Sequence, residues 1–205
     1  EWVPWLATDY TWQDNNKKLL FTIRSGVQWS DGKPFTAHDV AYTFNLKKKH
    51  PALDTRNSWG YLESVDAVSD TKVEVNFNRV YVPGFGAIAE QIIIPEHIWR
   101  ELEDPLKFSN PNPVGTGPFT EVLRFNSQVW ELGKNPNYWQ PGKPHIEKLI
   151  FPTHSNNEQT TLALLSGKLD WAGAFIPAIE RIFVDKDPQH HHYWFRDTGY
   201  STFLH

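Results

Sequence analysis

The sequence has 205 residues, of which 40% are hydrophobic and 15% aromatic, so the chain is large enough to bury a hydrophobic core. Its formal net charge is -4 and its lysines are scattered, whereas nucleic-acid binding needs basic residues gathered on one face, so we expect no nucleic-acid partner. Cysteine is absent, which excludes disulfides, thiolate metal sites and cysteine nucleophiles.

The first run of elements is a strand, a turn and a capped helix. Residues 19–24 alternate between apolar and polar side chains, which predicts a strand, and Asp31 with the following glycine marks a turn. Thr36 and Asp39 have the spacing of a capping box, which predicts a helix from residue 37 to residue 48. An apolar stripe recurs at helical spacing along this helix, so we expect three polar residues nearer water: His38, Asp39 and Thr43.

A hairpin and two short helices follow. Residues 61–68 and 72–78 alternate on either side of a polar turn, which predicts two antiparallel strands. Short apolar runs then predict a helix over residues 87–91 and another that starts at Pro95 and continues to Leu102.

A segment without periodic apolar residues, Asp104 to Pro113, divides the chain. It is rich in proline, asparagine and serine, which is typical of a connection between domains, and we place the boundary near residue 112. Residues 1–112 are then expected to form a satellite α+β subdomain, and residues 113–205 part of a main α/β domain.

The second part of the chain mixes strands and helices. A helix capped by Asn156 and ended by Gly167 is expected over residues 158–165, and a short buried strand over residues 169–174. A further helix is expected over residues 177–183, so the segment has a βαβ-like alternation. The strands expected in this part are residues 119–125, 128–132, 146–151, 169–174, 192–196 and 200–204.

Catalytic and metal-binding motifs are missing from the sequence. It contains no His-Glu-x-x-His, Gly-x-Ser-x-Gly, phosphate-binding loop or dinucleotide fingerprint, so we expect no enzyme and no cofactor. His190, His191 and His192 are adjacent, but neighbours on a strand point to opposite faces, so we expect no physiological metal site there.

Ordered blocks of sequence carry a family resemblance. The strand, turn and helix of residues 21–44 resemble the signature of the extracytoplasmic solute-binding proteins of ABC importers, family 5, the oligopeptide-, dipeptide- and nickel-binding type with its oligosaccharide- and cellobiose-binding branch. Four further blocks occur in the family's order and at about its spacing: residues 112–119, 134–139, 143–151 and 166–170.

The resemblance implies a fold and a role. The fold would be α/β: a fragment of a bilobal periplasmic-binding-protein-like fold of type II, cluster C, with a mixed sheet, flanking helices and the β-rich satellite subdomain. Members of the family are longer, so the chain resembles a piece of the first lobe, with the crossover to a second lobe near residues 200–205. The whole protein would be monomeric and periplasmic or extracellular, including a form tethered to the outer face of the membrane, and would deliver a small-molecule ligand to a membrane permease.

The resemblance also points to positions that line the ligand cleft. In oligopeptide-binding relatives the cleft is lined by the segment after the first helix, the start of the helix after the third strand, the stretch after the Ser-Gly-x-Leu-Asp block and the crossover strand. The matching residues here are Asn57, Trp59, Tyr61, Asn157, Trp171, Ala174, Phe175 and Tyr200.

The ligand itself is left open between two classes. Several of these positions offer tryptophan or small apolar residues where a peptide binder tends to offer charged and amide groups, and indole rings stack on sugar rings. This favours an oligosaccharide, for instance a cello-oligosaccharide or other β-glucoside, over an oligopeptide. A glycan-active enzyme is a more distant alternative, because no pair of carboxylates for such chemistry is evident. With one lobe alone, ligand binding is expected to be weak or absent.

Overall fold

The computed structural model describes residues 3–193, and the chain divides into two compact units, Glu1–Phe151 and Pro152–His205. The boundary predicted near residue 112 falls inside the first unit, so the division into a satellite subdomain and a main domain stays a prediction. No helix within residues 3–193 combines the length and the apolar character needed to cross a bilayer.

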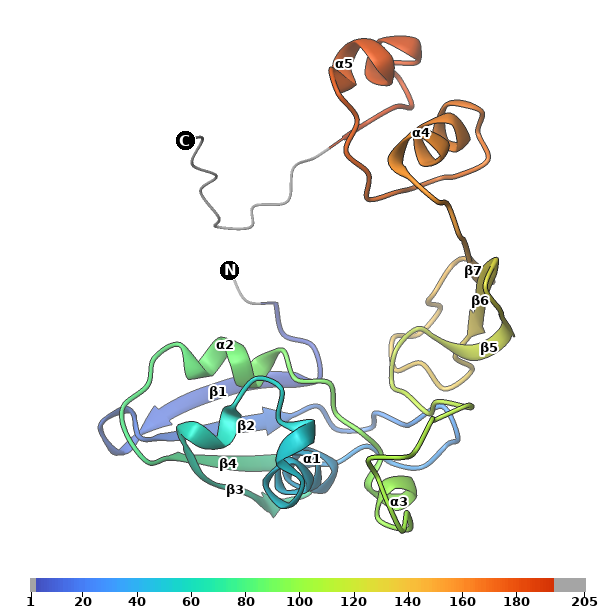
Figure 1. Ribbon diagram of the computed structural model, residues 1–205. Helices are drawn as coiled ribbons and strands as arrows, with labels where there is room; N and C mark the ends of the chain where they lie inside the picture. The colour runs from blue at the N-terminus through green and yellow to red at the C-terminus, as the bar shows by residue number, and fades with distance from the viewer. Residues whose placement is uncertain (1–2, 194–205) are drawn as a thin grey trace. The chain divides into compact units, whose positions relative to one another are not determined.

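The first unit contains a four-stranded antiparallel sheet (Figure 1). Its strands are β1 (Ala7–Gln13), β2 (Lys18–Ile23), β3 (Leu62–Ser69) and β4 (Lys72–Phe77), in the order β1-β2-β4-β3. The strands predicted over residues 19–24, 61–68 and 72–78 are therefore confirmed. β1 was not predicted, because most of its side chains are exposed and the segment shows no buried apolar face.

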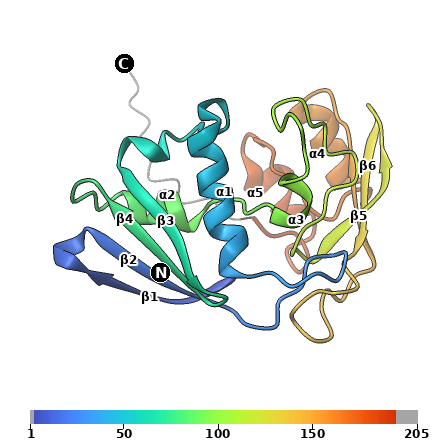
Figure 2. The same ribbon diagram turned by 90° about the horizontal axis from the view of Figure 1, so that it is seen from below.

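Helix α1 (Ala37–Lys49) contacts β3 and β4 and runs along one side of this sheet (Figure 2). Thr36 and Asp39 form the predicted capping box, so the start of the helix is confirmed. The expectation that Asp39 and Thr43 lie nearer water is wrong, since they are only 5% and 1% exposed. The largest fully buried side chains of the core around the helix and sheet are Trp29, Phe44, Phe77 and Leu19.

Two short helices follow the sheet in sequence. α2 (Gly84–Ala89) starts three residues before the helix predicted over residues 87–91. α3 (Glu96–Trp99) begins after Pro95 as predicted but makes a single turn, so the expected continuation to Leu102 is wrong. Short 3₁₀ segments lie at η1 (Asp14–Asn16), η2 (Pro51–Leu53) and η3 (Ser58–Gly60).

A second sheet has the strand order β5-β6-β7 and is formed by β5 (Phe119–Phe125), β6 (Val129–Lys134) and β7 (Lys148–Pro152). β5 and β6 pair antiparallel, as predicted for residues 119–125 and 128–132. β7 overlaps the third strand that was predicted over residues 146–151.

The second unit contains α4 (Asn157–Leu165), α5 (Ile179–Ile182) and a 3₁₀ segment, η4 (Val184–Lys186). The Asn156 side chain caps α4 by accepting from the Gln159 backbone N–H at 2.9 Å, and Gly167 follows the helix at a φ of 68°, as predicted. The buried strand predicted over residues 169–174 is wrong, because this segment is irregular and largely exposed. α5 is shorter than the helix predicted over residues 177–183, because Ala178 has a left-handed backbone conformation.

The last predicted strands fall near the end of the chain. Residues 192 and 193 are irregular, and the rest of the predicted strand 192–196 lies outside the described residues, as does the strand predicted over residues 200–204.

Candidate functional site

The candidate residues of the first unit lie on a turn that an aspartate holds in shape. The Asp54 carboxylate accepts hydrogen bonds from the backbone N–H groups of Ser58 and Trp59, both at 2.9 Å. Asn57, at the tip, is exposed and has a left-handed conformation with a φ of 51°, which asparagine tolerates better than most residues. A Cβ added to Gly60 would lie 2.7 Å from the Asn57 side-chain nitrogen, so the glycine leaves room for the amide.

Trp59 is partly exposed to solvent, and its side chain contacts α1. Its indole N–H donates to the Phe44 carbonyl at 2.9 Å, and the Lys48 ammonium lies 4.3 Å from the ring centroid. A cation over the indole face stabilises the pair electrostatically. Trp59 therefore attaches the turn to α1. Its indole N–H already has an acceptor within the protein.

Tyr61 belongs to the hydrophobic core. It is 6% exposed, stacks with Phe77 at 6.1 Å between ring centroids and packs against Tyr81 at 4.6 Å. Burial raises the pKa of its phenol, and the Ser58 hydroxyl offsets part of this effect. The Tyr61 side chain is therefore part of the core beneath the turn and offers little surface to a ligand.

The second unit holds Asn157, Trp171, Ala174 and Phe175, while Tyr200 lies outside the described residues. Asn157 is the exposed first residue of α4. Trp171 and Phe175 are 62% and 75% exposed on the irregular segment that precedes α5, and Ala174 between them is half-buried. Single exposed apolar residues are common, and each of these two aromatic rings offers a flat face to solvent.

The candidate residues of each unit lie close together along the chain, except Asn157, which lies on α4. Asn57, Trp59 and Tyr61 share one turn, and Trp171, Ala174 and Phe175 share one irregular segment.

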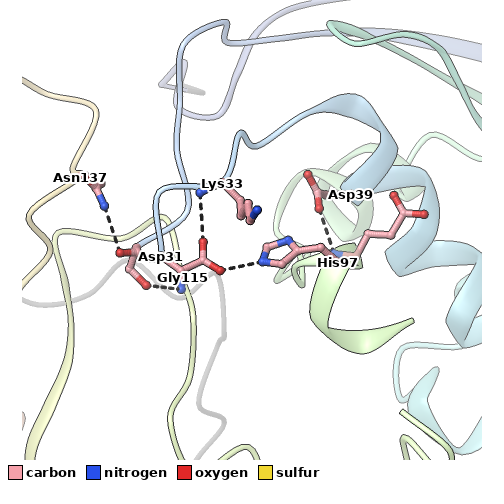
Figure 3. Close-up of polar contacts among 8 residues, drawn as sticks. Asp31, Lys33, Asp39, His97, Gly115 and Asn137 are labelled. Carbon is pink, nitrogen blue, oxygen red and sulfur yellow. Dashed lines mark hydrogen bonds and ion pairs between the residues drawn. The ribbon is translucent and has the colours of Figure 1, made fainter. Parts of the chain in front are cut away.

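A polar network joins the turn at residues 30–33 to α3 (Figure 3). The Asp31 carboxylate accepts from the Lys33 backbone N–H at 3.2 Å and pairs with His97 Nε2 at 2.7 Å. Burial raises the pKa of Asp31, but the bonds to His97 and to the Lys33 backbone, with the charge of the imidazole, outweigh it and hold the pKa below its ordinary value. Asp31 therefore stays ionised, and its contact with His97 holds the turn against α3.

Asp39 makes a second connection to the same helix. One carboxylate oxygen accepts from the Thr36 backbone N–H and the other from the Glu96 backbone N–H, each at 2.9 Å. Thr43, one turn further along α1, accepts from the Ile94 backbone N–H at 3.1 Å. Both polar residues are buried because they satisfy backbone donors of the segment that leads into α3.

Two later sequence blocks converge on the same turn. Asn137 donates to the Ser30 carbonyl at 3.0 Å, and the backbone N–H of Gly115 donates to the Ser30 hydroxyl at 3.3 Å. Two of the four later blocks thus hold the turn at Ser30 through hydrogen bonds, which is a structural role. The sequence showed Asp31 only as a turn residue, because its partner His97 lies 66 positions away and gives no local signal.

An apolar cavity of about 410 Å³ lies in the first unit among the N-terminal segment, β1, α1 and α2. Tyr10 and Phe85 meet at its wall with 4.4 Å between ring centroids. None of the described candidate residues lines it.

Within residues 3–193 no group of three or more metal-ligating side chains is close enough to hold an ion. His190 pairs with Asp187 at 3.0 Å, and His191 is hydrogen-bonded to the Phe183 carbonyl at 2.7 Å while stacking on its ring. The adjacent histidines therefore have local partners of different kinds.

Comparison with known proteins gives consistent matches. Residues 1–204 match the family described as bacterial extracellular solute-binding proteins, family 5 Middle. Protein XP55 of Streptomyces lividans is 32% identical over 85% of this chain and 31% of its own length. The oligopeptide-binding protein OppA of Bacillus subtilis is 28% identical over 82% of this chain and 34% of its length.

A solved structure shows the same fold. The oligopeptide-binding protein of an ABC transporter from Thermotoga maritima, solved with bound mannohexaose, superposes with a TM-score of 0.79 at 30% identity. The match covers 90% of this chain and 34% of that protein. The predicted α/β class, part of a bilobal binding-protein fold, is confirmed, and the chain spans about a third of the length of the relatives it matches.

Proposed function

The chain belongs to family 5 of the bacterial extracellular solute-binding proteins, and on that basis we propose that it is part of the ligand-binding subunit of an ABC importer. The subunit captures a solute outside the cytoplasmic membrane, in the periplasm or at the cell exterior, and passes it to a membrane permease. This chain supplies part of the first lobe, and a second lobe completes the cleft. Closure of the lobes is favoured because the ligand contacts both of them.

The proposed ligand is an oligosaccharide, with cello-oligosaccharides and other β-glucosides as the first class to test. The observation that carries this proposal is the exposure of two aromatic side chains, Trp171 and Phe175. Residues 171–178 contain no charged side chain, so this surface offers flat apolar faces to a neutral ligand. Similarity to a protein solved with mannohexaose supports the same class.

An oligopeptide is the second candidate. The similarity to the oligopeptide-binding protein of Bacillus subtilis favours it. A peptide carries charged termini that need charged or hydrogen-bonding partners, and these would have to come from outside residues 171–178. Asn57, with its exposed side-chain amide, is the candidate in the first unit for contacting a polar ligand group of either class.

The proposed role is binding without turnover. A glycan-active enzyme needs a carboxylic acid whose pKa is raised so that it can donate a proton. In residues 3–193 the carboxyl groups with a shifted pKa all shift downward, through hydrogen bonds that stabilise their ionised form: Asp31, Glu74, Glu180 and Asp187. This is opposite to what the general acid requires.

Titration separates the candidates. Tryptophan fluorescence of the longer protein that we propose carries this chain would be followed on addition of cello-oligosaccharides and, separately, of a mixed peptide pool. We expect a saturable response to the sugars that Trp171→Ala and Phe175→Ala weaken about tenfold, as loss of one stacked ring predicts. Phe125→Ala is the matched control, since Phe125 is a similarly exposed phenylalanine on β5. A saturable response to peptides alone would overturn the ligand class, and release of shortened sugars would overturn the binding role.

A further inference from the structure

A second concave surface in the first unit is lined by none of the residues proposed above to contact the solute. It is a groove of about 740 Å³ between the ends of β1 and β2, the turn before β4, and the segment around residues 139–143. The residues that line it are Thr8, Thr22, Ile23, Arg24, Ser25, Gly26, Thr71, Trp139, Gln140, Pro141 and Lys143.

The lining of this groove is basic and rich in hydrogen-bond donors. It contains an arginine, a lysine, four hydroxyl side chains and a glutamine amide, and no aspartate or glutamate lines it. A third cation lies at its edge, because Lys72 Nζ donates to the Thr22 hydroxyl at 2.6 Å. Clustered cations without carboxylates attract anions and repel other cations.

Arg24 is held in a fixed position within the groove. Its Nε donates to the Trp5 carbonyl at 2.8 Å, and its guanidinium carbon lies 4.3 Å from the centroid of the Trp139 ring. These contacts use Nε and one face of the planar group. In the described part of the chain, neither Arg24 Nη1 and Nη2 nor Lys143 Nζ has a hydrogen bond or ion pair. A guanidinium that is already immobilised loses little conformational entropy when it binds an oxyanion through two parallel hydrogen bonds.

We propose that the groove is an anion-binding site, with Arg24 as the bidentate ligand and Lys143 as the second cation. Its ligand is an oxyanion of the phosphate or carboxylate class, and the hydroxyl groups of Thr22 and Thr71 supply further hydrogen bonds. The oxyanion comes either from a free solute or from the headgroup of an anionic phospholipid, and these sources share the chemistry that Arg24 recognises.

A titration of the 205-residue chain with inorganic phosphate and with acetate tests the site. Backbone amide shifts of residues 22–26 and 139–143 are expected to change saturably, and less at high salt because the charges are screened. Lys143→Gln should weaken phosphate binding about tenfold, the loss expected for one charge-assisted hydrogen bond. Lys49→Gln is the matched control, since this exposed lysine at the end of α1 makes the same charge change outside the groove.

A second variant and a vesicle assay complete the test. Arg24→Lys keeps the charge and removes the guanidinium fork, so phosphate binding should weaken at least tenfold, while the melting temperature reports any loss of packing. Binding to phosphatidylglycerol vesicles but not to phosphatidylcholine vesicles, weakened by Lys143→Gln, assigns the oxyanion to a lipid headgroup. Phosphate binding without vesicle binding assigns it to a free solute. Shifts that do not saturate, or equal weakening by Lys49→Gln and Lys143→Gln, would overturn the site.

Discussion

Replacing Asp39 by asparagine is expected to destabilise the first unit through a defined pair of hydrogen bonds. One carboxylate oxygen accepts from the Thr36 backbone N–H and the other from the Glu96 backbone N–H, so the side chain both caps α1 and holds the start of α3. The residue is 5% exposed, so water cannot replace a lost acceptor. Asparagine keeps one oxygen and places an NH₂ group opposite the other backbone donor.

The size of the effect follows from the buried donor that is left without an acceptor. An unsatisfied buried polar group costs about 1–3 kcal/mol, and loss of a negative charge at a helix N-terminus adds about 0.3–1 kcal/mol. We therefore expect Asp39→Asn to lower the free energy of unfolding by about 2–3 kcal/mol. For a domain of this size, that corresponds to a decrease in melting temperature of about 4–12 °C.

Two measurements check this prediction. Urea unfolding followed by tryptophan fluorescence gives the change in stability, and amide hydrogen exchange at Glu96 reports the broken contact directly. Asp66→Asn is the matched control, because Asp66 is exposed and, among residues 3–193, its side chain accepts only from the Ser64 hydroxyl. If Asp39→Asn changes the free energy of unfolding by less than about 0.5 kcal/mol, the size typical of a surface substitution, the two hydrogen bonds of Asp39 do not stabilise the unit as expected.

Three further predictions rest on single contacts. Asn156→Ala removes the cap of α4 and should destabilise the second unit by about 1 kcal/mol, measured by circular dichroism during urea unfolding; an unchanged midpoint would contradict the capping role. Trp59→Phe removes the hydrogen bond to the Phe44 carbonyl and should cost about 1 kcal/mol in the same assay. Asp31 has a pKa below its ordinary value of 3.8, so the stability from its contact with His97 is present above pH 4 and is lost as the pH falls through the folded-state pKa; Asp31→Asn should remove that part of the pH dependence.

The elements that were predicted correctly are those with strong local signals. α1 has a capping box and an apolar stripe, and β3 and β4 alternate around a polar turn, so residues within a few positions determine them. β1 lacks such a signal, because its side chains are mostly exposed and its pairing with β2 supplies the order. The strand predicted over residues 169–174 was wrong, because the segment contains Asp170 and Gly173 and has no partner strand among the described residues.

The candidate site shows the same limit. The tryptophan-rich composition singled out Trp59 and Trp171, but it could not distinguish a ring anchored to a carbonyl of α1 from one that is exposed. The Asp39 carboxylate is buried because it accepts from the Glu96 backbone N–H, 57 positions away in the sequence. In the groove, Arg24 packs on Trp139, which is also distant in the sequence. Such contacts depend on tertiary structure, and no local pattern in the sequence encodes them.

One titration shows whether the exposed aromatic side chains of this chain help to capture an oligosaccharide. Cello-oligosaccharides are added to the proposed longer protein and to its Trp171→Ala variant, and the dissociation constants are compared by calorimetry. We expect saturable binding that the variant weakens about tenfold, with heat that returns to the baseline after each injection because no bond is cleaved. Equal affinities in the two proteins, or binding of peptides without any binding of sugars, would contradict it.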